Sequence, residues 1–180
     1  NYYLEYAAPK IYPRPSYTKK YSITFVGQHT HRREQYFKHL ADLGLQIWGY
    51  HRWQQSSLKH LAHGPVPVHQ AHRIIGQSKI VVNMLTGNIR TQPQEINIRT
   101  FETLGMGSFL LIQEYPHLHK YFKIGKELVT FTTPQNLRRK AIYYLTHDAE
   151  REAIATAGYR RILRDHTFDH RLKQLFKIIK

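Results

Sequence analysis

The sequence predicts an α/β fold: a Rossmann-like open parallel sheet with flanking helices and a helical C-terminal tail. Three observations support this prediction. From residue 21 onward, short apolar runs of strand length alternate with segments in which apolar residues recur at helical spacing. From residue 134 to the end, the pattern is helical throughout. The chain has 180 residues, which is enough for one domain and short for two.

The first predicted elements lie at residues 21–50. The apolar run YSITFVG (21–27) ends in glycine, which predicts a buried strand followed by a tight turn. Residues 31–44 have aromatic and leucine side chains at helical spacing and end at a glycine, a common stop signal for helices. Residues 45–50 are a second apolar run. The order strand, helix, strand is typical of a parallel sheet because the helix carries the chain back along the sheet.

The same order is repeated along the rest of the chain. The predicted elements are a loop and helix within 64–78, a strand at 79–85, a helix at 96–105, strands at 108–113 and 126–131, and helices at 134–147, 148–166 and 167–180. Pro134 suits the first turn of its helix, where a backbone N–H has no partner to lose.

Residues 1–20 differ from the rest of the chain. Pro9, Pro13 and Pro15 oppose both a helix and a central strand. The segment also contains five tyrosines, which we expect to pack against the domain. We therefore predict an extended Pro/Tyr-rich lead-in over 1–20 and a Rossmann-like domain over 21–180. Because the first residue is not methionine, we expect the chain to be a piece of a longer protein.

The chain is strongly basic, with 27 Lys and Arg against 12 Asp and Glu, which gives a net charge of +15. Such an excess attracts anions: nucleotides, phosphorylated substrates, nucleic acid or an acidic membrane surface. The basic residues are spread along the chain without a run of five, and neither an RNA-binding aromatic motif nor a zinc-finger spacing occurs. A basic surface around an anion-binding enzyme is therefore favoured, and nucleic acid is disfavoured as a partner.

Missing residue types and motifs exclude several kinds of site. The sequence has no cysteine, which excludes disulfides, thiolate metal sites and cysteine nucleophiles and fits a cytoplasmic protein. None of GxGxxG, the Walker loop, HExxH and GxSxG occurs. His29 and His31 lack a matched third ligand, so no metal site is predicted. No run of about 18 apolar residues is present, so no membrane span is predicted either.

The segment GQHTHRRE, directly after the first strand, is a candidate anion site. In open α/β sheets, ligands bind at the carboxyl ends of the strands. Gly27 lets the backbone approach a ligand, and the following helix N-terminus favours an anion that Arg32 and Arg33 would neutralise. A plain turn with solvated arginines is the alternative interpretation.

The segment EINIRTFETLGMG (95–107) is a second candidate. Glu95 and Glu102 are seven residues apart, two turns if the stretch is one helix, with Arg99 between them. A surface ladder of ion pairs would explain this pattern. Alternatively Glu102, beside the turn at Gly105 and Gly107, accepts hydrogen bonds from a ribose diol, since a carboxylate can accept from two hydroxyls at once.

A third segment, DHTFDHR (165–171), precedes the last helix. Thr167 suits an N-cap because its side-chain oxygen can accept from a backbone N–H, and His166 is a weaker candidate for capping or catalysis.

Several of these motifs, in this order, resemble a known family. The stretches YSITFVGQHTHRREQYFKHL, NIRTFETLGMGSFLLIQE and FKIGKELVTF, with the later AG and DHTFDHR, are similar to the CgeB-like spore maturation proteins. Those proteins are similar to group 1 glycosyltransferases of the GT-B fold. The resemblance covers residues 21–171.

The resemblance implies the C-terminal, donor-binding half of a glycosyltransferase, which holds a UDP-, GDP- or dTDP-linked sugar without a metal. Glu102 matches the glutamate that binds the ribose, and Gly105 and Gly107 match the turn beside it. Gly27 and the basic residues after it, Arg32 and Arg33, match the loop near the donor phosphates. Arg99 is a further candidate cation for the leaving diphosphate.

Glu95 lies near the place of the first glutamate in the paired-glutamate motif of retaining enzymes, one residue closer to Glu102 than in that motif. We expect it to act on the donor sugar. The resemblance also implies a missing N-terminal acceptor domain and an unknown acceptor. The alternative is a non-catalytic module of GT-B-like fold that binds an anionic polymer or a protein partner through its basic surface.

Overall fold

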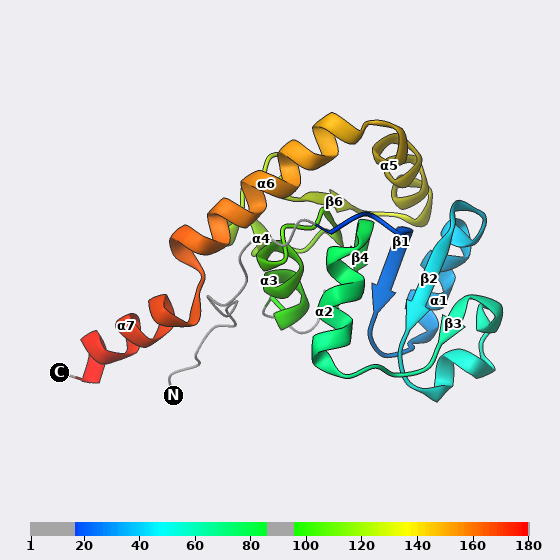
Figure 1. Ribbon diagram of the computed structural model, residues 1–180, viewed down its shortest axis with the longest axis horizontal. Coiled ribbons are helices and arrows are strands. Elements are labelled where there is room, and N and C mark those ends of the chain that lie inside the picture. The colour runs from blue at the N-terminus through cyan, green and yellow to red at the C-terminus, as the bar shows by residue number, and fades with distance from the viewer. Residues whose placement is uncertain (1–16, 86–95, 180) are drawn as a thin grey trace.

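A six-stranded sheet forms the centre of the molecule (Figure 1). The computed structural model describes residues 17–85 and 96–179. The sheet has the order β3-β2-β1-β4-β5-β6, and every neighbouring pair is parallel. The strands are β1 Tyr21–Val26, β2 Leu45–Trp48, β3 Ala62–His63, β4 Ser78–Asn83, β5 Leu110–Gln113 and β6 Val129–Phe131. The predicted Rossmann-like parallel sheet is therefore confirmed.

The helices lie between and after the strands. They are α1 His31–Phe37, α2 Val68–Gly76, α3 Ile98–Gly105, α4 Leu118–Tyr121, α5 Pro134–Thr146, α6 Asp148–Asp165 and α7 Phe168–Ile179, with 3-10 helices η1 Lys38–Leu43, η2 His51–Gln55 and η3 Lys59–Leu61. None of the helices in the described ranges combines the length and the hydropathy that crossing a membrane would require.

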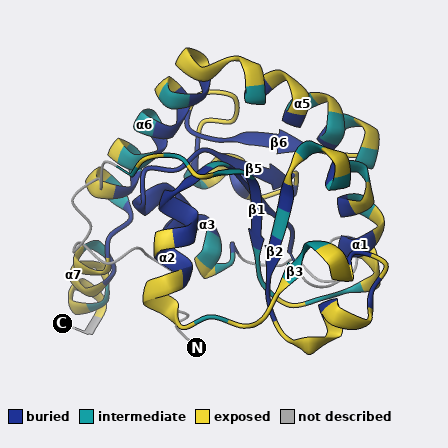
Figure 2. Cartoon of the chain, turned by 45° about the vertical axis from the view of Figure 1, so that its right-hand side comes forward, coloured by how far each residue is buried: buried dark blue, intermediate teal, exposed yellow. Residues whose placement is uncertain are grey.

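Successive residues of the central strands pack into different cores. Ile80 and Val82 of β4 join a cluster with side chains of α1 and α5, whereas Val81 packs with α2 on the other face. On β5, Leu111 faces the first cluster and Leu110 faces a core built with α3. Both faces of the sheet are thus covered, which explains why its strands are continuous apolar runs (Figure 2).

The strand order reverses direction between β1 and β4. From β1 the chain first moves outward through β2 to β3, and it then returns to β4 on the other side of β1. Ile23 of β1 pairs with both Leu45 of β2 and Ile80 of β4. The carboxyl edge at such a reversal is a topological switch point, where ligands bind in open α/β sheets.

The C-terminal helices follow the sheet as predicted. Thr133 is the N-cap of α5, with Pro134 in the first turn, and its side chain accepts from the N–H of Asn136 at 3.1 Å. On α6, Gly158 lies so close to the chain that an added Cβ would be 2.4 Å from the Glu127 carbonyl oxygen. The last helix, α7, extends from the end of α6 at one end of the molecule (Figure 1).

Several short features differ from the prediction, the strand β3 and the start of α3 among them. Strand β3 has only two residues, too few to give an apolar run, and it was not predicted. Helix α3 begins at Ile98, two residues later than expected, because Asn97 is its N-cap with extended backbone. Most of the predicted lead-in lies outside the described residues; its last part, residues 17–20, has no regular secondary structure, and Lys20 N–H donates to the Gln77 carbonyl at 2.7 Å.

Candidate functional site

A cavity of about 230 Å³ opens at the carboxyl edge of β1 and β2, beside the switch point. Four parts of the chain line it: the ends of these two strands, the segment that enters α2, and α3. The lining residues are Val26, Gly27, Gln28, Trp48, Gly49, Tyr50, Pro65, Val66, Val68, Ala71, Arg99 and Glu102. Three residues predicted from the sequence, Gly27, Arg99 and Glu102, therefore line the same cavity.

Close backbone packing forms the floor between the two strand ends. The N–H of Gly27 donates to the Trp48 carbonyl at 2.9 Å. The carbonyl of Gly27 accepts from Trp53 Nε1 at 2.9 Å. A Cβ added to Gly49 would lie 2.2 Å from that carbonyl, so Gly49 is the residue whose missing side chain permits the approach. The sequence singled out Gly27 but gave no signal for Gly49.

Glu102 is the buried carboxylate of the cavity wall. It is 7% exposed, its Oε2 lies 2.8 Å from Arg99 Nη1, and its Oε1 lies 3.0 Å from His72 Nε2. Burial opposes the charged form, but the hydrogen bond from His72 and the charge of Arg99 outweigh it and lower the pKa of Glu102. The carboxylate is therefore ionised at neutral pH. The predicted Arg99–Glu102 ion pair exists and lines the cavity, with the two side chains 23% and 9% exposed. Glu95, the other glutamate of the predicted ladder, lies outside the described residues.

The position of α3 is fixed by asparagines. Asn83, the last residue of β4, donates through Nδ2 to Asn97 Oδ1 at 2.8 Å and to Thr100 Oγ1 at 3.1 Å. Asn97 Oδ1 in turn accepts from the backbone N–H of Thr100 at 3.2 Å, which caps the helix. The N-terminus of α3 is thus tied to the end of the neighbouring strand, and Glu102 projects from the second turn.

Arg33 bridges the loops that follow the two central strands. Its Nη1 donates to the Gln28 carbonyl, after β1, at 2.7 Å, and its Nη2 donates to the Met84 carbonyl, after β4. The guanidinium lies over the Phe25 ring, 5.0 Å from the centroid. Burial lowers the pKa of Arg33 to about 10, and no carboxylate among the described residues forms an ion pair with it. Arg33 is thus a buried cation at the switch point, held by two backbone carbonyls.

Arg32 lies differently from Arg33. It is exposed on α1, with its guanidinium 5.8 Å from the centroid of the Tyr36 ring. Neither arginine belongs to the described residues that line the cavity. The phosphate-binding role of both stays a prediction, and only Arg33 is held near the ends of the central strands.

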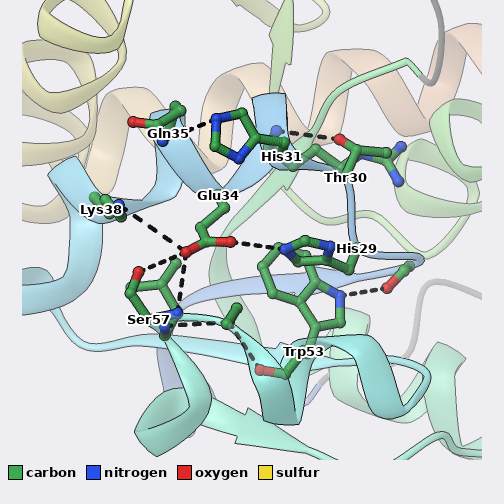
Figure 3. A network of polar contacts seen from close by, with 12 residues as sticks. His29, Thr30, His31, Glu34, Gln35, Lys38, Trp53 and Ser57 are labelled. Carbon is green, nitrogen blue, oxygen red and sulfur yellow. Dashed lines mark hydrogen bonds and ion pairs between the residues drawn. The ribbon is translucent and has the colours of Figure 1, made fainter.

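A polar network beside the cavity joins α1 to the segment that contains η2 and η3 (Figure 3). Glu34 Oε1 accepts from the N–H and the hydroxyl of Ser57 at 3.0 and 2.6 Å, and Oε2 lies 2.8 Å from His29 Nε2. These bonds, that from the Ser57 hydroxyl above all, lower the pKa of Glu34 to about 2. The His29 ring meets Trp53 edge-on at 4.7 Å. Through His29, the network therefore supports the Trp53 side chain, which donates to the Gly27 carbonyl.

The two glycines after Glu102 lie away from the cavity. Gly105 is the last residue of α3, and Gly107 has φ of 67° in the turn that leads to β5. Since β5 is parallel to the other strands, this turn is at the amino edge of the sheet, opposite the cavity. This position explains why glycines occur here, because they end a helix and form the turn after it. Their nucleotide-binding role stays a prediction.

Glu95 lies outside the described residues, so its role on the donor sugar also stays a prediction. The stretch 95–102 is not one continuous helix, because α3 starts only at Ile98 and Asn97 is extended. Within the described ranges, no group of three or more His, Asp or Glu side chains is placed to hold a metal ion.

Comparison with known proteins assigns the chain to a family. The model of a family described as glycosyl transferase-like matches residues 32–177. This protein belongs to the glycosyl transferase-like family. No curated protein matches its sequence.

Solved structures share the fold at low sequence identity. HepE of Anabaena, in complex with UDP and glucose, has 9% identity and a TM-score of 0.71, over 88% of this chain and 48% of HepE. TarM has 12% identity and a TM-score of 0.69, over 94% and 37% of the two chains. Sucrose-phosphate synthase of Thermosynechococcus elongatus has 11% identity and a TM-score of 0.67, over 98% and 49%. The chain thus spans about half or less of the structures that it matches.

Sequence reasoning missed His72, the second partner of Glu102. His72 is on α2, buried, and 30 residues from Glu102 in the sequence. Its helix places Ala71 in the cavity wall and His72 against α3. A contact between two helices of a predicted sheet leaves no local pattern, and this histidine is one of thirteen.

Proposed function

We propose that this chain is the donor-binding domain of a glycosyltransferase. In this proposal it holds a UDP-, GDP- or dTDP-linked sugar, independently of a metal, for transfer to an acceptor held by another domain. The observation that carries the proposal is the ionised Glu102 in the wall of a cavity at the switch point. In a member of the glycosyl transferase-like family, such a carboxylate suits a ribose hydroxyl, because it only accepts hydrogen bonds.

The transfer requires stabilisation of a leaving diphosphate. The bond between the anomeric carbon and the phosphate oxygen breaks, the acceptor hydroxyl bonds to that carbon and loses its proton, and the nucleoside diphosphate departs. Fixed cations and helix N-termini can hold the charge that develops on the diphosphate. Arg33 is preorganised for this task because two carbonyls fix its guanidinium at the ends of β1 and β4. Arg99, in the cavity wall, is the second cation.

The finer assignment follows the motifs in the sequence. We place the chain in group 1 of the glycosyltransferases with the GT-B fold, near the CgeB-like spore maturation proteins, and in the cytoplasm. Glu95 is the candidate for the donor sugar. The base that activates the acceptor belongs to the other domain, so the chain alone should bind the donor better than it turns the donor over.

The proposal is tested by calorimetry and thermal shift with UDP, GDP, dTDP, CMP and their sugars, with and without a chelator. We expect saturable binding of one nucleotide that the chelator leaves unchanged and that Glu102→Ala abolishes or strongly weakens. Binding that depends on added metal would contradict the metal-independent site. The absence of binding by any nucleotide, both for this chain and for a longer protein that contains it, would contradict the donor-binding function.

A non-catalytic module is the second candidate, and the net charge of +15 favours it. Such a module would bind an anionic polymer with an affinity that falls steeply as the salt concentration rises. This affinity would not change when Glu102 is substituted. Titration with heparin at two salt concentrations, for wild type and Glu102→Ala, separates the two functions.

A further inference from the structure

The two oxygens of Glu102 have different surroundings. Oε2 is enclosed, and Arg99 Nη1, itself enclosed, lies 2.8 Å from it. Oε1 has one described protein partner, His72 Nε2, at 3.0 Å. Because a carboxylate oxygen can accept two hydrogen bonds, Oε1 keeps one acceptor position after His72 has donated.

We propose that His72 is a positioning residue that orients Glu102 so that Oε1 accepts one ribose hydroxyl of the bound nucleotide. The inference rests on the proposed donor-binding function and deepens it. In this arrangement Arg99 fixes Oε2 from the same helix, and His72 fixes Oε1 from the neighbouring helix. The site then distinguishes a nucleotide that has the hydroxyl from a deoxynucleotide that lacks it.

Helix α2 explains why His72 can do this. The residue before it, Ala71, lines the cavity. The same helix therefore supplies both part of the cavity wall and the imidazole that donates to Glu102. The side chains of both His72 and Glu102 are about 90% buried, at 10% and 9% exposed. Water therefore cannot easily replace the histidine as a donor. Since Glu102 is ionised and accepts only, His72 Nε2 carries the hydrogen in this bond.

The loss of His72 should act on the hydroxyl contact. Without the donor at Oε1, only Arg99 among the described residues holds the carboxylate, so Oε1 can turn away from the ribose hydroxyl toward other donors. A hydrogen bond that involves a charged group contributes enough for a change of about ten-fold in affinity. This change should appear for the nucleotide that has the hydroxyl and not for the analogue that lacks it.

The test compares UDP with 2′-deoxy-UDP and 3′-deoxy-UDP, or the guanosine set if GDP is the nucleotide that binds. We expect wild type to bind one deoxy analogue about ten-fold more weakly than the parent diphosphate. His72→Ala should reduce this ratio to about two-fold or less, through weaker binding of the parent. His72→Gln places an amide N–H near the position of Nε2 and should restore most of the ratio.

His69→Ala is the matched control, because His69 is on the same helix but exposed. It should leave the ratio and the thermal midpoint unchanged. A purely structural role of His72 would lower the midpoint and weaken all three nucleotides by the same factor, and that result would overturn the inference. A wild type that discriminates against neither deoxy analogue would also overturn it. If neither this chain nor a longer protein that contains it binds any of the nucleotides, the proposed function itself fails.

Discussion

Two regions of the molecule bury a histidine next to an arginine, with different surroundings. At the carboxyl edge of the sheet, His72 and Arg99 both contact Glu102 in the wall of a cavity. At the junction of α6 and α7, Arg171 Nη2 donates to His166 Nδ1 at 2.9 Å. There Arg171 Nη1 also lies 3.4 Å from the Asp165 carbonyl oxygen, and neither side chain lines the cavity.

The second pair is satisfied by the backbone. His166 Nε2 lies 3.2 Å from the Tyr121 carbonyl, and the ring packs against Phe101 and Phe122. This arrangement uses both nitrogens of a neutral ring and fixes the start of α7 on the rest of the molecule. A buried charge therefore does not mark a ligand site by itself. The two regions differ because the first has a cavity, and because Glu102 Oε1 there can accept a second hydrogen bond.

The largest effect should come from removing the arginine of the junction. Arg171→Ala leaves His166 Nδ1 without its buried donor, so we expect the free energy of unfolding to fall by about 3 kcal/mol. Urea unfolding measures the loss. Lys173→Ala, on the exposed side of the same helix, should change stability by less than about 0.5 kcal/mol. A large change in nucleotide affinity for Arg171→Ala would contradict the contrast between the two regions.

The next effect concerns Glu102 and a second buried glutamate. Glu127 is also 7% exposed and near an arginine. However, it packs against α6, accepts from the Lys123 N–H at 2.7 Å, and lines no part of the cavity. Glu102→Gln should weaken nucleotide binding by about 2 kcal/mol, because the amide presents a donor where a carboxylate accepts. Glu127→Gln should leave affinity unchanged in the same titration. Equal losses for both variants would mean that folding alone causes them.

A third prediction concerns the pH dependence of stability at the junction. Burial, with help from Arg171, lowers the pKa of His166 to about 4. At a pH above about 6.5 the ring is neutral in both states, so its contribution to stability is complete. Below that pH the unfolded chain takes up the proton first. Stability should therefore fall between pH 6.5 and 4, by on the order of 2 kcal/mol.

His166→Asn removes the titrating group and should flatten this part of the curve, as measured by urea unfolding at several pH values. Because other histidines also titrate, the difference between wild type and variant is the quantity to compare. Curves that stay parallel from pH 7 to 4 would show that His166 is protonated as easily in the folded state as in the unfolded one.

The smallest effect should come from Arg33→Lys. A lysine cannot donate to two carbonyls with the fixed fork of a guanidinium, so the loops after β1 and β4 lose their bridge. We expect about five-fold weaker binding of UDP, equivalent to about 1 kcal/mol, and little change for uridine, which has no phosphate. Arg32→Lys, exposed on the same helix, should have a smaller effect. If UDP and uridine weaken equally, Arg33 does not act on the phosphates.

The fold was predictable because its strands and helices have strong local patterns. β1, β4 and β5 are apolar runs since both faces of the sheet are covered, and α5 begins at a proline that suits the first turn. The edge strand β3 was missed because two residues paired to β2 carry no pattern of their own. The start of α3 was placed two residues early because the capping role of Asn97 depends on Asn83 of β4.

Residues of the candidate site were predictable only where a local sequence pattern marks the residue itself. Glu102 could be found from its motif, and Gly27 from its place after a strand. His72, Ser57 and Gly49 could not, because their roles depend on contacts with residues 22 to 30 positions away. The motif at 165–171 was recognisable, but its chemistry was not. Thr167 Oγ1 bonds to His170 Nδ1 at 2.6 Å and His166 bonds to Arg171, which makes the motif a structural junction.

The most direct test is a crystal structure of this chain with the nucleoside diphosphate that binds it best. We predict that the nucleotide occupies the cavity at the ends of β1 and β2, with a ribose hydroxyl within about 3.2 Å of Glu102 Oε1. The bond from His72 to that oxygen should be retained. A nucleotide bound elsewhere on the basic surface, with Glu102 touching only Arg99 and His72, would contradict the donor-binding site.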